Sequence, residues 1–197
     1  MTEDILKKYY DNYDEESRLL KKSGVPEFVT TIKYVDKYLK NGDRILEIGA
    51  GTGRYSHYFA QKGFEVEAVE LVQSNIDVFN KNTRPEENIN VRQGNALDLS
   101  FYGDNSFDIT LLLGPMYHLF SEQDKLKALS EAIRVTKKDG VVFVAYCMNE
   151  ASIISYGFLK GILLMQLNVA LLMQRPINLH LYLMRYLNYT GKMISTS

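Results

Sequence analysis

The sequence predicts an α/β fold in which a doubly wound, mostly parallel sheet carries helices on both faces. Segments with strand periodicity and segments with helical periodicity alternate from residue 26 to residue 147. The central strand-like segments are apolar on both faces, and FDITLLLG (107–114) contains a continuous apolar run. Strands buried on both sides and joined by right-handed crossovers form a doubly wound sandwich.

Nine segments make up this alternation. The expected strands are residues 44–48, 65–71, 89–95, 107–114 and 141–147. The expected helices are residues 26–41, 53–61, 74–82 and 122–140. In the last helix, the apolar residues at helical spacing are Leu126, Leu129 and Ile133.

Local signals mark several helix ends. The pair Asn41-Gly42 is expected to end the first helix, and Gly63 is expected to cap the second at its C-terminus. Ser74 is a candidate N-cap for the third helix. Gly140 is expected to stop the fourth helix.

The composition changes after Glu150. Residues 151–197 contain four Lys or Arg and no Asp or Glu. The uncharged stretch 161–174 is shorter than the roughly 20 residues that span a bilayer, so we expect a buried or interfacial helix and no transmembrane segment. Residues 177–187 alternate as a strand does. The apolar surface of this tail is a candidate contact for a second copy of the chain in a homodimer.

The overall composition narrows the class of protein. The net charge of −1 gives no reason to expect a nucleic acid as partner. The single Cys147 cannot form an internal disulfide, and the first 20 residues are too charged for a secretory signal, so a cytoplasmic location is expected. No His or Cys cluster has metal-ligand spacing, so we expect no metal.

A glycine loop follows the first expected strand. In ILEIGAGTGRYS (45–56), Gly49, Gly51 and Gly53 alternate at the end of a buried strand. In an open parallel sheet, ligands bind beyond the carboxyl ends of the strands, and glycine lets the backbone come close to a ligand. Glu70 ends the second strand 21 residues after Gly49, where a carboxylate can accept both hydroxyls of a ribose. The ligand is therefore expected to contain a ribose.

Two classes of ribose-containing ligand are compatible with this arrangement. Dinucleotide-binding loops follow the pattern G-x-G-x-x-G, whereas this loop follows G-x-G-x-G and has Arg54 at the position of the last glycine of that pattern. The acidic Glu47 before the loop would repel a pyrophosphate but tolerate a cationic ligand. Electrostatics therefore disfavours a nicotinamide dinucleotide.

At this point the chain resembles the class I S-adenosylmethionine-dependent methyltransferases of the small, single-domain kind. The resemblance starts at ILEIGAGTGRYS and continues through EVEAVEL, QGNALDLSF, NSFDITLLLGPMYHLF and EAIRVTKKDGVVFVAY, covering residues 5–150. The length of the chain predicts one domain over residues 1–197. The resemblance implies a helical N-terminal lid (1–40), a cofactor-binding core (43–147) and a C-terminal antiparallel hairpin that completes the sheet. The atypical apolar tail (148–197) departs from this pattern because a second hairpin strand is not evident, so either the hairpin is incomplete or the tail docks elsewhere.

The resemblance also implies which residues bind the cofactor, S-adenosylmethionine. The implied contacts are a backbone cradle for the methionyl part, which Glu47 supports, a carboxylate for the ribose, and an adenine site in which a side chain and a main-chain N–H bind the ring. A lid residue pairs with the carboxylate of the ligand. The residues at these positions are Glu47, Gly49, Gly51, Gly53, Glu70, Leu71, Asn95, Ala96, Leu113, Gly114, Tyr10 and Arg18.

Within this set, the resemblance implies that adenine binds at Asn95 and Ala96. The family more often has Asp at the first of these positions, but the side-chain carbonyl of Asn can accept the same hydrogen bond. Leu113 and Gly114 are expected under the amino-acid part and the sulfonium. Arg18 is expected to pair with the ligand carboxylate.

GPMYHL (114–119) follows the fourth strand, at a position where members of the family have residues that face the transferred methyl group. Tyr117 is a candidate for contact between its ring face and the sulfonium. His118 is a candidate general base because its ordinary pKa is near 6.5. Methyl transfer can also be accelerated by orientation alone, so the base role is a hypothesis.

The predicted function is transfer of a methyl group from S-adenosylmethionine to an oxygen or nitrogen of a small molecule. Two alternatives stay open at this point: a nicotinamide-dependent oxidoreductase, and a non-catalytic module that binds the cofactor or a partner. The acceptor is not identified by the sequence.

Overall fold

A computed structural model of the chain describes residues 25–146 and the backbone of residues 187–189. The predicted lid and most of the apolar tail, including Tyr10, Arg18 and residues 161–174, lie outside the described residues. Among the described helices, none is long and apolar enough to cross a membrane.

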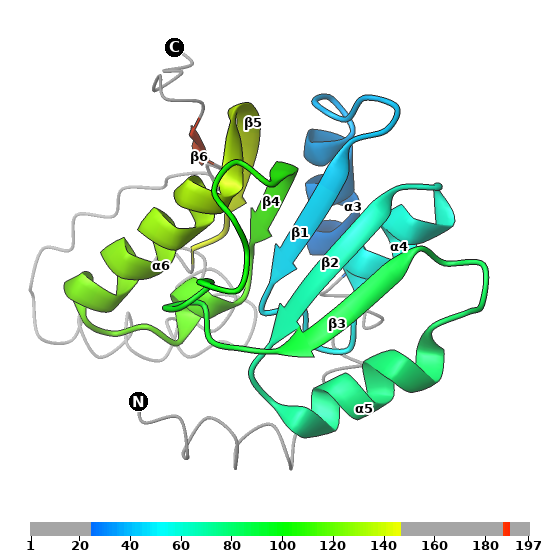
Figure 1. The fold of residues 1–197 in the computed structure, drawn as a ribbon, viewed down its shortest axis with the longest axis horizontal. Coiled ribbons are helices and arrows are strands. Elements are labelled where there is room, and N and C mark those ends of the chain that lie inside the picture. The colour runs from blue at the N-terminus through cyan, green and yellow to red at the C-terminus, as the bar shows by residue number, and fades with distance from the viewer. Residues whose placement is uncertain (1–24, 147–186, 190–197) are drawn as a thin grey trace, which may run out of the picture. The chain divides into compact units, whose positions relative to one another are not determined.

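The described residues form the predicted doubly wound sheet (Figure 1). Its strands lie in the order β3-β2-β1-β4-β5-β6, and β1 to β5 run parallel to one another. The strands are β1 (Arg44–Ile48), β2 (Glu65–Glu70), β3 (Ile89–Gln93), β4 (Phe107–Leu112), β5 (Thr136–Val144) and β6 (Leu187–Tyr189). The strand order reverses between β1 and β4, which is where open α/β sheets bind ligands.

The described helices cover both faces of the sheet, as predicted (Figure 1). They are α3 (Val25–Val35), α4 (Arg54–Gln61), α5 (Gln73–Asn82), the short 3₁₀ helix η1 (Pro115–Tyr117) and α6 (Glu122–Val135). Side chains of α3 and α4 pack on one face, against residues such as Ile45 and Ile109, and α5 adds Phe79 to that side. The other face, with Leu46 and Leu112, packs against α6.

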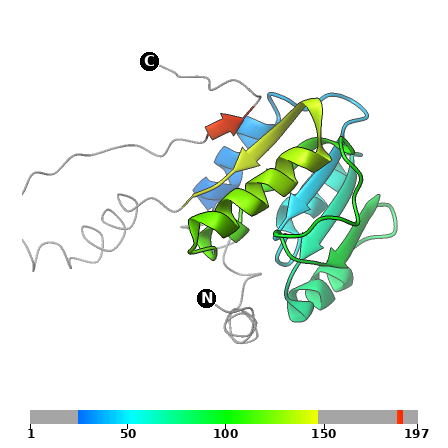
Figure 2. The ribbon, with the colours of Figure 1, turned by 60° about the vertical axis from the view of Figure 1, so that its left-hand side comes forward.

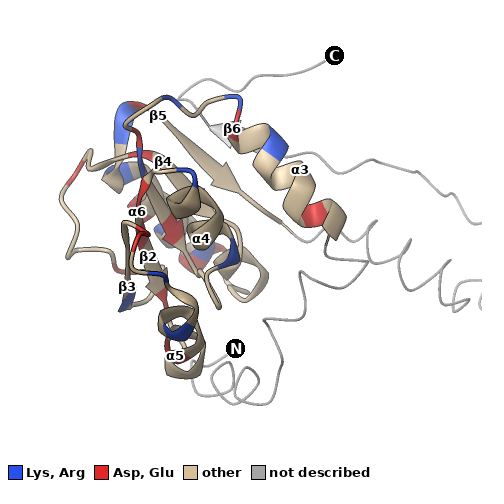
Figure 3. Ribbon diagram, turned by 90° about the vertical axis from the view of Figure 1, so that its right-hand side faces the viewer, with Lys and Arg blue, Asp and Glu red and all other residues tan. Residues whose placement is uncertain are grey.

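Charge placement supports the first of these helices. In α3, Glu27 lies in the first turn and Lys33 in the last, so Figure 3 shows an acidic and a basic position near its opposite ends. Each charge is favourable beside the corresponding end of the helix dipole. The helix ends at Val35, earlier than the predicted end at residue 41, and turns lead from there to β1.

Two further predicted helix signals, besides the Asn41-Gly42 stop, are wrong. Ser74 lies inside α5, whose N-cap is Val72, because the helix begins immediately after the end of β2. Gly140 lies in β5 and does not stop α6, which ends at Val135. A Cβ on Gly140 would lie 2.6 Å from the carbonyl oxygen of Asp108, so close approach of β4 explains the glycine. Gly63 is confirmed at the end of α4, with a φ of +89°.

The buried face of α6 differs from the face that the apolar spacing indicates. Of the three predicted residues, Leu129 is partly buried against the core, whereas Leu126 and Ile133 are 58% and 41% exposed. Ala128, Ala132 and Val135 are the α6 residues buried against the sheet. Small alanine side chains let the helix approach the sheet closely, and they occupy the contact that the larger residues were expected to make.

The sixth strand adds an antiparallel edge. Residues 187–189 pair with Val142–Val144 of β5, which Figure 2 shows as the short strand beside β5. The predicted strand over 177–187 lies outside the described residues except at its last position.

Candidate cofactor site

The register of the sheet brings the ends of three strands together. Ile48, the last residue of β1, pairs with Val69 of β2 and with Leu112 of β4. The residues that follow these positions, Gly49, Glu70 and Leu113, therefore lie together at the carboxyl end of the sheet. The sequence separates these residues widely, and the parallel register makes them neighbours in space.

The glycine loop is anchored to β2. The main-chain N–H groups of Gly49 and Ala50 both donate to the carbonyl oxygen of Val69, at 2.7 and 3.1 Å. Gly49, Gly51 and Gly53 all have positive φ, at 74°, 56° and 86°. Residues with a Cβ rarely adopt this conformation, so the loop requires glycine for its path.

Two of these glycines also allow close packing within the protein. A Cβ on Gly49 would lie 2.6 Å from Cδ of Pro115, the residue that opens η1. A Cβ on Gly53 would lie 2.3 Å from the ring of Phe79 in α5. From the sequence, we expect these glycines to let a ligand approach the backbone. In the structure, side chains of the protein itself fill the space that a Cβ on Gly49 or Gly53 would occupy. The glycines thus join the ends of β1 and β4 and hold α4 against α5.

Glu70 is held beside this loop. The carboxylate accepts a hydrogen bond from the main-chain N–H of Gly51 at 2.8 Å and another from that of Val72 at 2.9 Å. The side-chain amide of Asn75 lies 3.3 Å from the second carboxylate oxygen. Burial raises the pKa of Glu70, and the N–H donors oppose the shift. The predicted ribose-binding acid is therefore fixed in orientation at the edge where the loop begins.

Glu47 caps α4, the helix that follows the glycine loop. The N-cap of α4 is Gly53, which has no side chain to satisfy the free N–H groups of the first turn. The carboxylate of Glu47 accepts from the main-chain N–H of Ser56 at 2.9 Å and also from its hydroxyl. Glu47 is 3% exposed, and burial raises its pKa to about 8. A strand residue thereby replaces the missing cap.

The predicted adenine-binding pair lies in a tight turn after β3. The side-chain oxygen of Asn95 accepts from the main-chain N–H of Leu97 at 2.9 Å, and its carbonyl oxygen accepts from Asp98 at 3.0 Å. Asn95 therefore shapes this turn. Ala96 is buried. Gln93 at the end of β3 donates to the carbonyl oxygen of Leu71, which ties this segment to the residue after Glu70.

The segment after β4 carries the candidate catalytic residues. Leu113 is buried, and Gly114 precedes η1, so Tyr117 and His118 follow directly from the edge where the glycine loop lies. A Cβ on Gly114 would lie 3.1 Å from the carbonyl oxygen of Gly49. His118 is half-buried, and burial lowers its pKa below the ordinary 6.5. A neutral imidazole at physiological pH is the form that accepts a proton.

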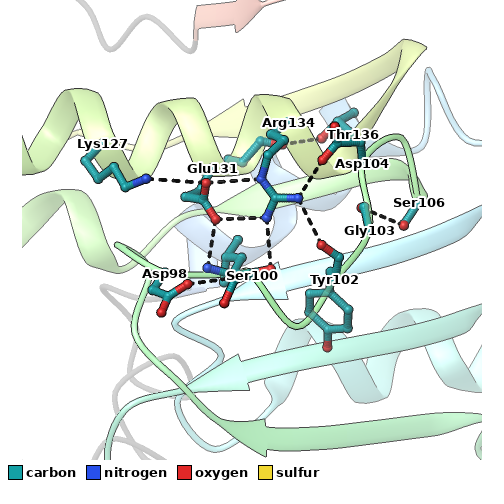
Figure 4. Close-up of polar contacts among 12 residues, drawn as sticks. Asp98, Ser100, Tyr102, Gly103, Asp104, Ser106, Lys127, Glu131, Arg134 and Thr136 are labelled. Atoms are coloured by element: carbon teal, nitrogen blue, oxygen red, sulfur yellow. Dashed lines mark hydrogen bonds and ion pairs between the residues drawn. The ribbon is translucent and has the colours of Figure 1, made fainter.

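An ion-pair cluster that the sequence analysis missed holds the loop between β3 and β4 against α6 (Figure 4). Glu131 is buried on α6 and accepts from the main-chain N–H of Leu99 at 2.8 Å. Arg134, one turn further along α6, donates to Glu131 at 2.9 and 3.1 Å.

Arg134 completes this cluster from the other side. Its guanidinium donates to the carbonyl oxygens of Leu99 and Tyr102, each at 2.9 Å, and to the carboxylate of Asp104 at 2.8 Å. The hydrogen bonds that Glu131 accepts from Arg134 and from the main-chain N–H of Leu99 lower the pKa of Glu131 to about 2. The Glu-x-x-Arg spacing on a helix is visible in the sequence, but its loop partners are about 30 residues away and are not.

The residues at this edge fit a ligand with hydroxyl groups and an anionic end. A fixed carboxylate, Glu70, is available to accept hydrogen bonds, and the loop beside it has no side chains at alternate positions. Nη1 of Arg54, the first residue after the loop, is buried without a hydrogen-bond partner in the described part of the chain. Within residues 25–146, no group of three or more His, Cys, Asp or Glu could hold a metal ion.

The chain is similar to known proteins over this core. A family model for the methyltransferase domain matches residues 46–144, which is half of the chain. A glycine/sarcosine N-methyltransferase from Aphanothece halophytica is 30% identical over 103 residues, covering 51% of this chain and 39% of that protein. A demethylmenaquinone methyltransferase from Renibacterium salmoninarum is 38% identical over 105 residues, covering 53% of this chain and 41% of that protein. The chain thus spans less than half the length of these relatives.

A solved structure supports the fold. The phosphoethanolamine N-methyltransferase 1 of Haemonchus contortus, in complex with phosphoethanolamine and S-adenosylhomocysteine, aligns with a TM-score of 0.61. The sequence identity is 22%, and the alignment covers 76% of this chain and 34% of that one.

Proposed function

The chain belongs to the methyltransferase-domain family, as a class I S-adenosylmethionine-dependent member, and on this premise we propose that it transfers a methyl group from S-adenosylmethionine to an oxygen or nitrogen of a small molecule. The observation that carries the proposal is Glu70, which is held by the N–H of Gly51 at the edge where the strand order reverses. A carboxylate fixed there is suited to accept hydrogen bonds from a ribose.

The cofactor-binding roles follow from the positions of the residues. When bound, S-adenosylmethionine supplies a methyl group activated on a sulfonium. Glu70 accepts hydrogen bonds from the ribose hydroxyls, and the turn at Asn95 and Ala96 receives the adenine. The loop Gly49–Gly53 and the segment at Leu113 and Gly114 hold the methionyl part, and Leu71 borders the ribose. Fixing these groups supplies the orientation on which an in-line displacement depends.

The catalytic roles belong to the segment after β4. Bound cofactor would supply a methyl carbon whose leaving group is a neutral thioether, and a lone pair of the acceptor would take up that carbon. Tyr117 would present its ring to the cationic centre. His118 takes the proton that the acceptor oxygen or nitrogen loses, since burial lowers its pKa and keeps the imidazole neutral.

The small-molecule acceptor is supported by two relatives, whose names specify glycine or sarcosine and demethylmenaquinone as what they methylate. The net charge of −1 supports the same class over a nucleic acid. A cytoplasmic location, which the lone Cys147 favours, and a homodimer through the apolar tail are further proposals.

The proposal is tested by incubating the full chain with a metabolite extract and S-adenosylmethionine labelled in the methyl group, followed by mass spectrometry. We expect a labelled product of low molecular mass that is absent with heat-inactivated protein and strongly reduced with Glu70→Gln. Tight binding of the cofactor without any labelled small molecule would contradict the proposal and would favour a non-catalytic binding module.

A further inference from the structure

Arg54 is placed at the exit of the glycine loop. It is the first residue of α4 and follows Gly53, the N-cap. Its guanidinium carbon lies 4.2 Å from the centre of the ring of Phe28, which belongs to α3. Phe28 in turn packs on Tyr55, with ring centres 5.0 Å apart. An aromatic platform on a neighbouring helix therefore supports the guanidinium from one face.

The guanidinium has unused hydrogen-bonding capacity. Nη1 of Arg54 is buried and lacks a hydrogen-bond partner in the described part of the chain. Arg44 and Arg134, by contrast, pair with carboxylates at 2.5 and 2.8 Å. An unsatisfied buried donor is costly, and more so when it carries charge. A site that keeps such a donor beside a ligand-binding loop is suited to an anion on the ligand.

The position selects the kind of anion. Arg54 is five residues after Gly49 and lies at the N-terminus of α4, where the partial positive charge of the helix also favours an anion. S-adenosylmethionine carries one negatively charged group, the α-carboxylate of its methionyl part, and the glycine loop is where the methionyl part is proposed to lie. The planar guanidinium matches a carboxylate in shape and charge.

We propose that Arg54 binds the α-carboxylate of the methionyl part of S-adenosylmethionine. This inference rests on the proposed function. The family resemblance implies this role for Arg18, which lies outside the described residues, whereas Arg54 has the buried donor without a partner in the described part of the chain, next to the loop. Phe28 acts as a positioning residue, because it holds the guanidinium plane.

The test compares two ligands that differ in one charge. Isothermal titration calorimetry would measure the binding of S-adenosylhomocysteine and of its carboxamide, in which the α-carboxylate is replaced by a neutral amide. The unmodified protein is expected to prefer the acid by about tenfold or more. Arg54→Met keeps an apolar stem on Phe28 and removes the charge, so it should bind the acid about tenfold or more weakly and the amide with little change. Arg54→Lys should show an intermediate preference.

Arg44→Met is the matched control, because Arg44 also stacks on a phenylalanine, at 4.9 Å from the ring of Phe107, but lies at the opposite end of β1. It should keep the preference for the acid, and circular dichroism should show that all variants are folded. If Arg54→Met keeps the full preference, or weakens both ligands equally, Arg54 does not bind the carboxylate. If the unmodified protein binds neither ligand, the proposed function itself fails and the inference fails with it.

Discussion

The main-chain N–H of Gly51 donates a hydrogen bond of 2.8 Å to Oε2 of Glu70. This bond joins the loop after β1 to the end of β2, and it aims a carboxylate at the edge where the strand order reverses. The loop and the acid are therefore parts of one unit.

Replacement of this carboxylate is expected to weaken cofactor binding. In Glu70→Gln, the amide group has one oxygen, so its NH₂ must face the N–H of Gly51 or that of Val72. We expect S-adenosylhomocysteine to bind about 10 to 100 times more weakly and the free energy of unfolding to fall by about 1 to 3 kcal/mol. Calorimetry and urea denaturation measure the two effects. Glu67→Gln on the same strand is the control and should bind the ligand with unchanged affinity. If both variants lose affinity equally, Glu70 does not bind the ligand.

The buried cap of α4 makes stability depend on pH. The pKa of Glu47 is raised from an ordinary 4.5 to about 8, so the unfolded chain loses this proton before the folded chain does. Stability that depends on the protonated form is therefore lost as the pH rises from about 4.5 to about 8.

Glu47→Gln stays neutral, and its amide oxygen can still accept from Ser56. The natural protein should lose stability between pH 5 and pH 8 and the variant should not, so the difference in unfolding free energy between them should change in favour of the variant by roughly 3 to 4 kcal/mol over this range. Urea denaturation of both proteins at a series of pH values measures this difference. A difference that does not change with pH would show that Glu47 is ionised in the folded protein.

The ion-pair cluster on α6 has the opposite pH dependence. The pKa of Glu131 is lowered to about 2, chiefly by Arg134, so its contribution to stability is present above pH 4.5 and is lost as the pH falls toward 2. Glu131→Gln should lower the free energy of unfolding by about 3 kcal/mol at pH 7, and this loss should shrink below pH 4.5. Glu122→Gln, exposed on the same helix, should cost less than about 1 kcal/mol. A loss of equal size at pH 7 and pH 3 would exclude an ionic role for Glu131.

His118 is expected to act as a base with an unusually low pKa. Because burial lowers its pKa, kcat/KM for the acceptor should rise with pH along a limb below pH 6.5 and be level above it. His118→Asn should lower kcat/KM by about 100-fold to 10,000-fold and remove that limb. The measurement is a pH profile with the identified acceptor. An unchanged profile in the variant would mean that orientation alone drives the transfer.

The sequence predicts the order of the elements and the glycine loop because both depend on short-range patterns. Gly49, Gly51 and Gly53 stand directly after an apolar strand, and Glu70 stands at the end of the next strand, so their meeting follows from a parallel register. The cap of α4 by Glu47 did not follow, because it needs the tertiary packing of α4 on β1.

Side-chain size explains another miss. The spacing of Leu126 and Ile133 indicates an apolar face, but hydrophobic periodicity does not show which apolar residues fit a close contact. Ala128 and Ala132 are small enough to bring α6 onto the sheet, and the larger residues remain exposed. The partners of Arg134 could not be predicted from the sequence either, because Leu99 and Tyr102 lie on a loop that is far from Arg134 along the chain.

The central claim is that the edge formed by Gly49, Gly51, Gly53 and Glu70 binds an adenosyl sulfonium ligand. The most direct measurement is isothermal titration of the full chain with S-adenosylhomocysteine and, separately, with NADH. We expect saturable binding of S-adenosylhomocysteine with one site per chain and little or no binding of NADH. Preference for NADH would contradict it, since a nicotinamide dinucleotide would then occupy the crevice beside Glu70.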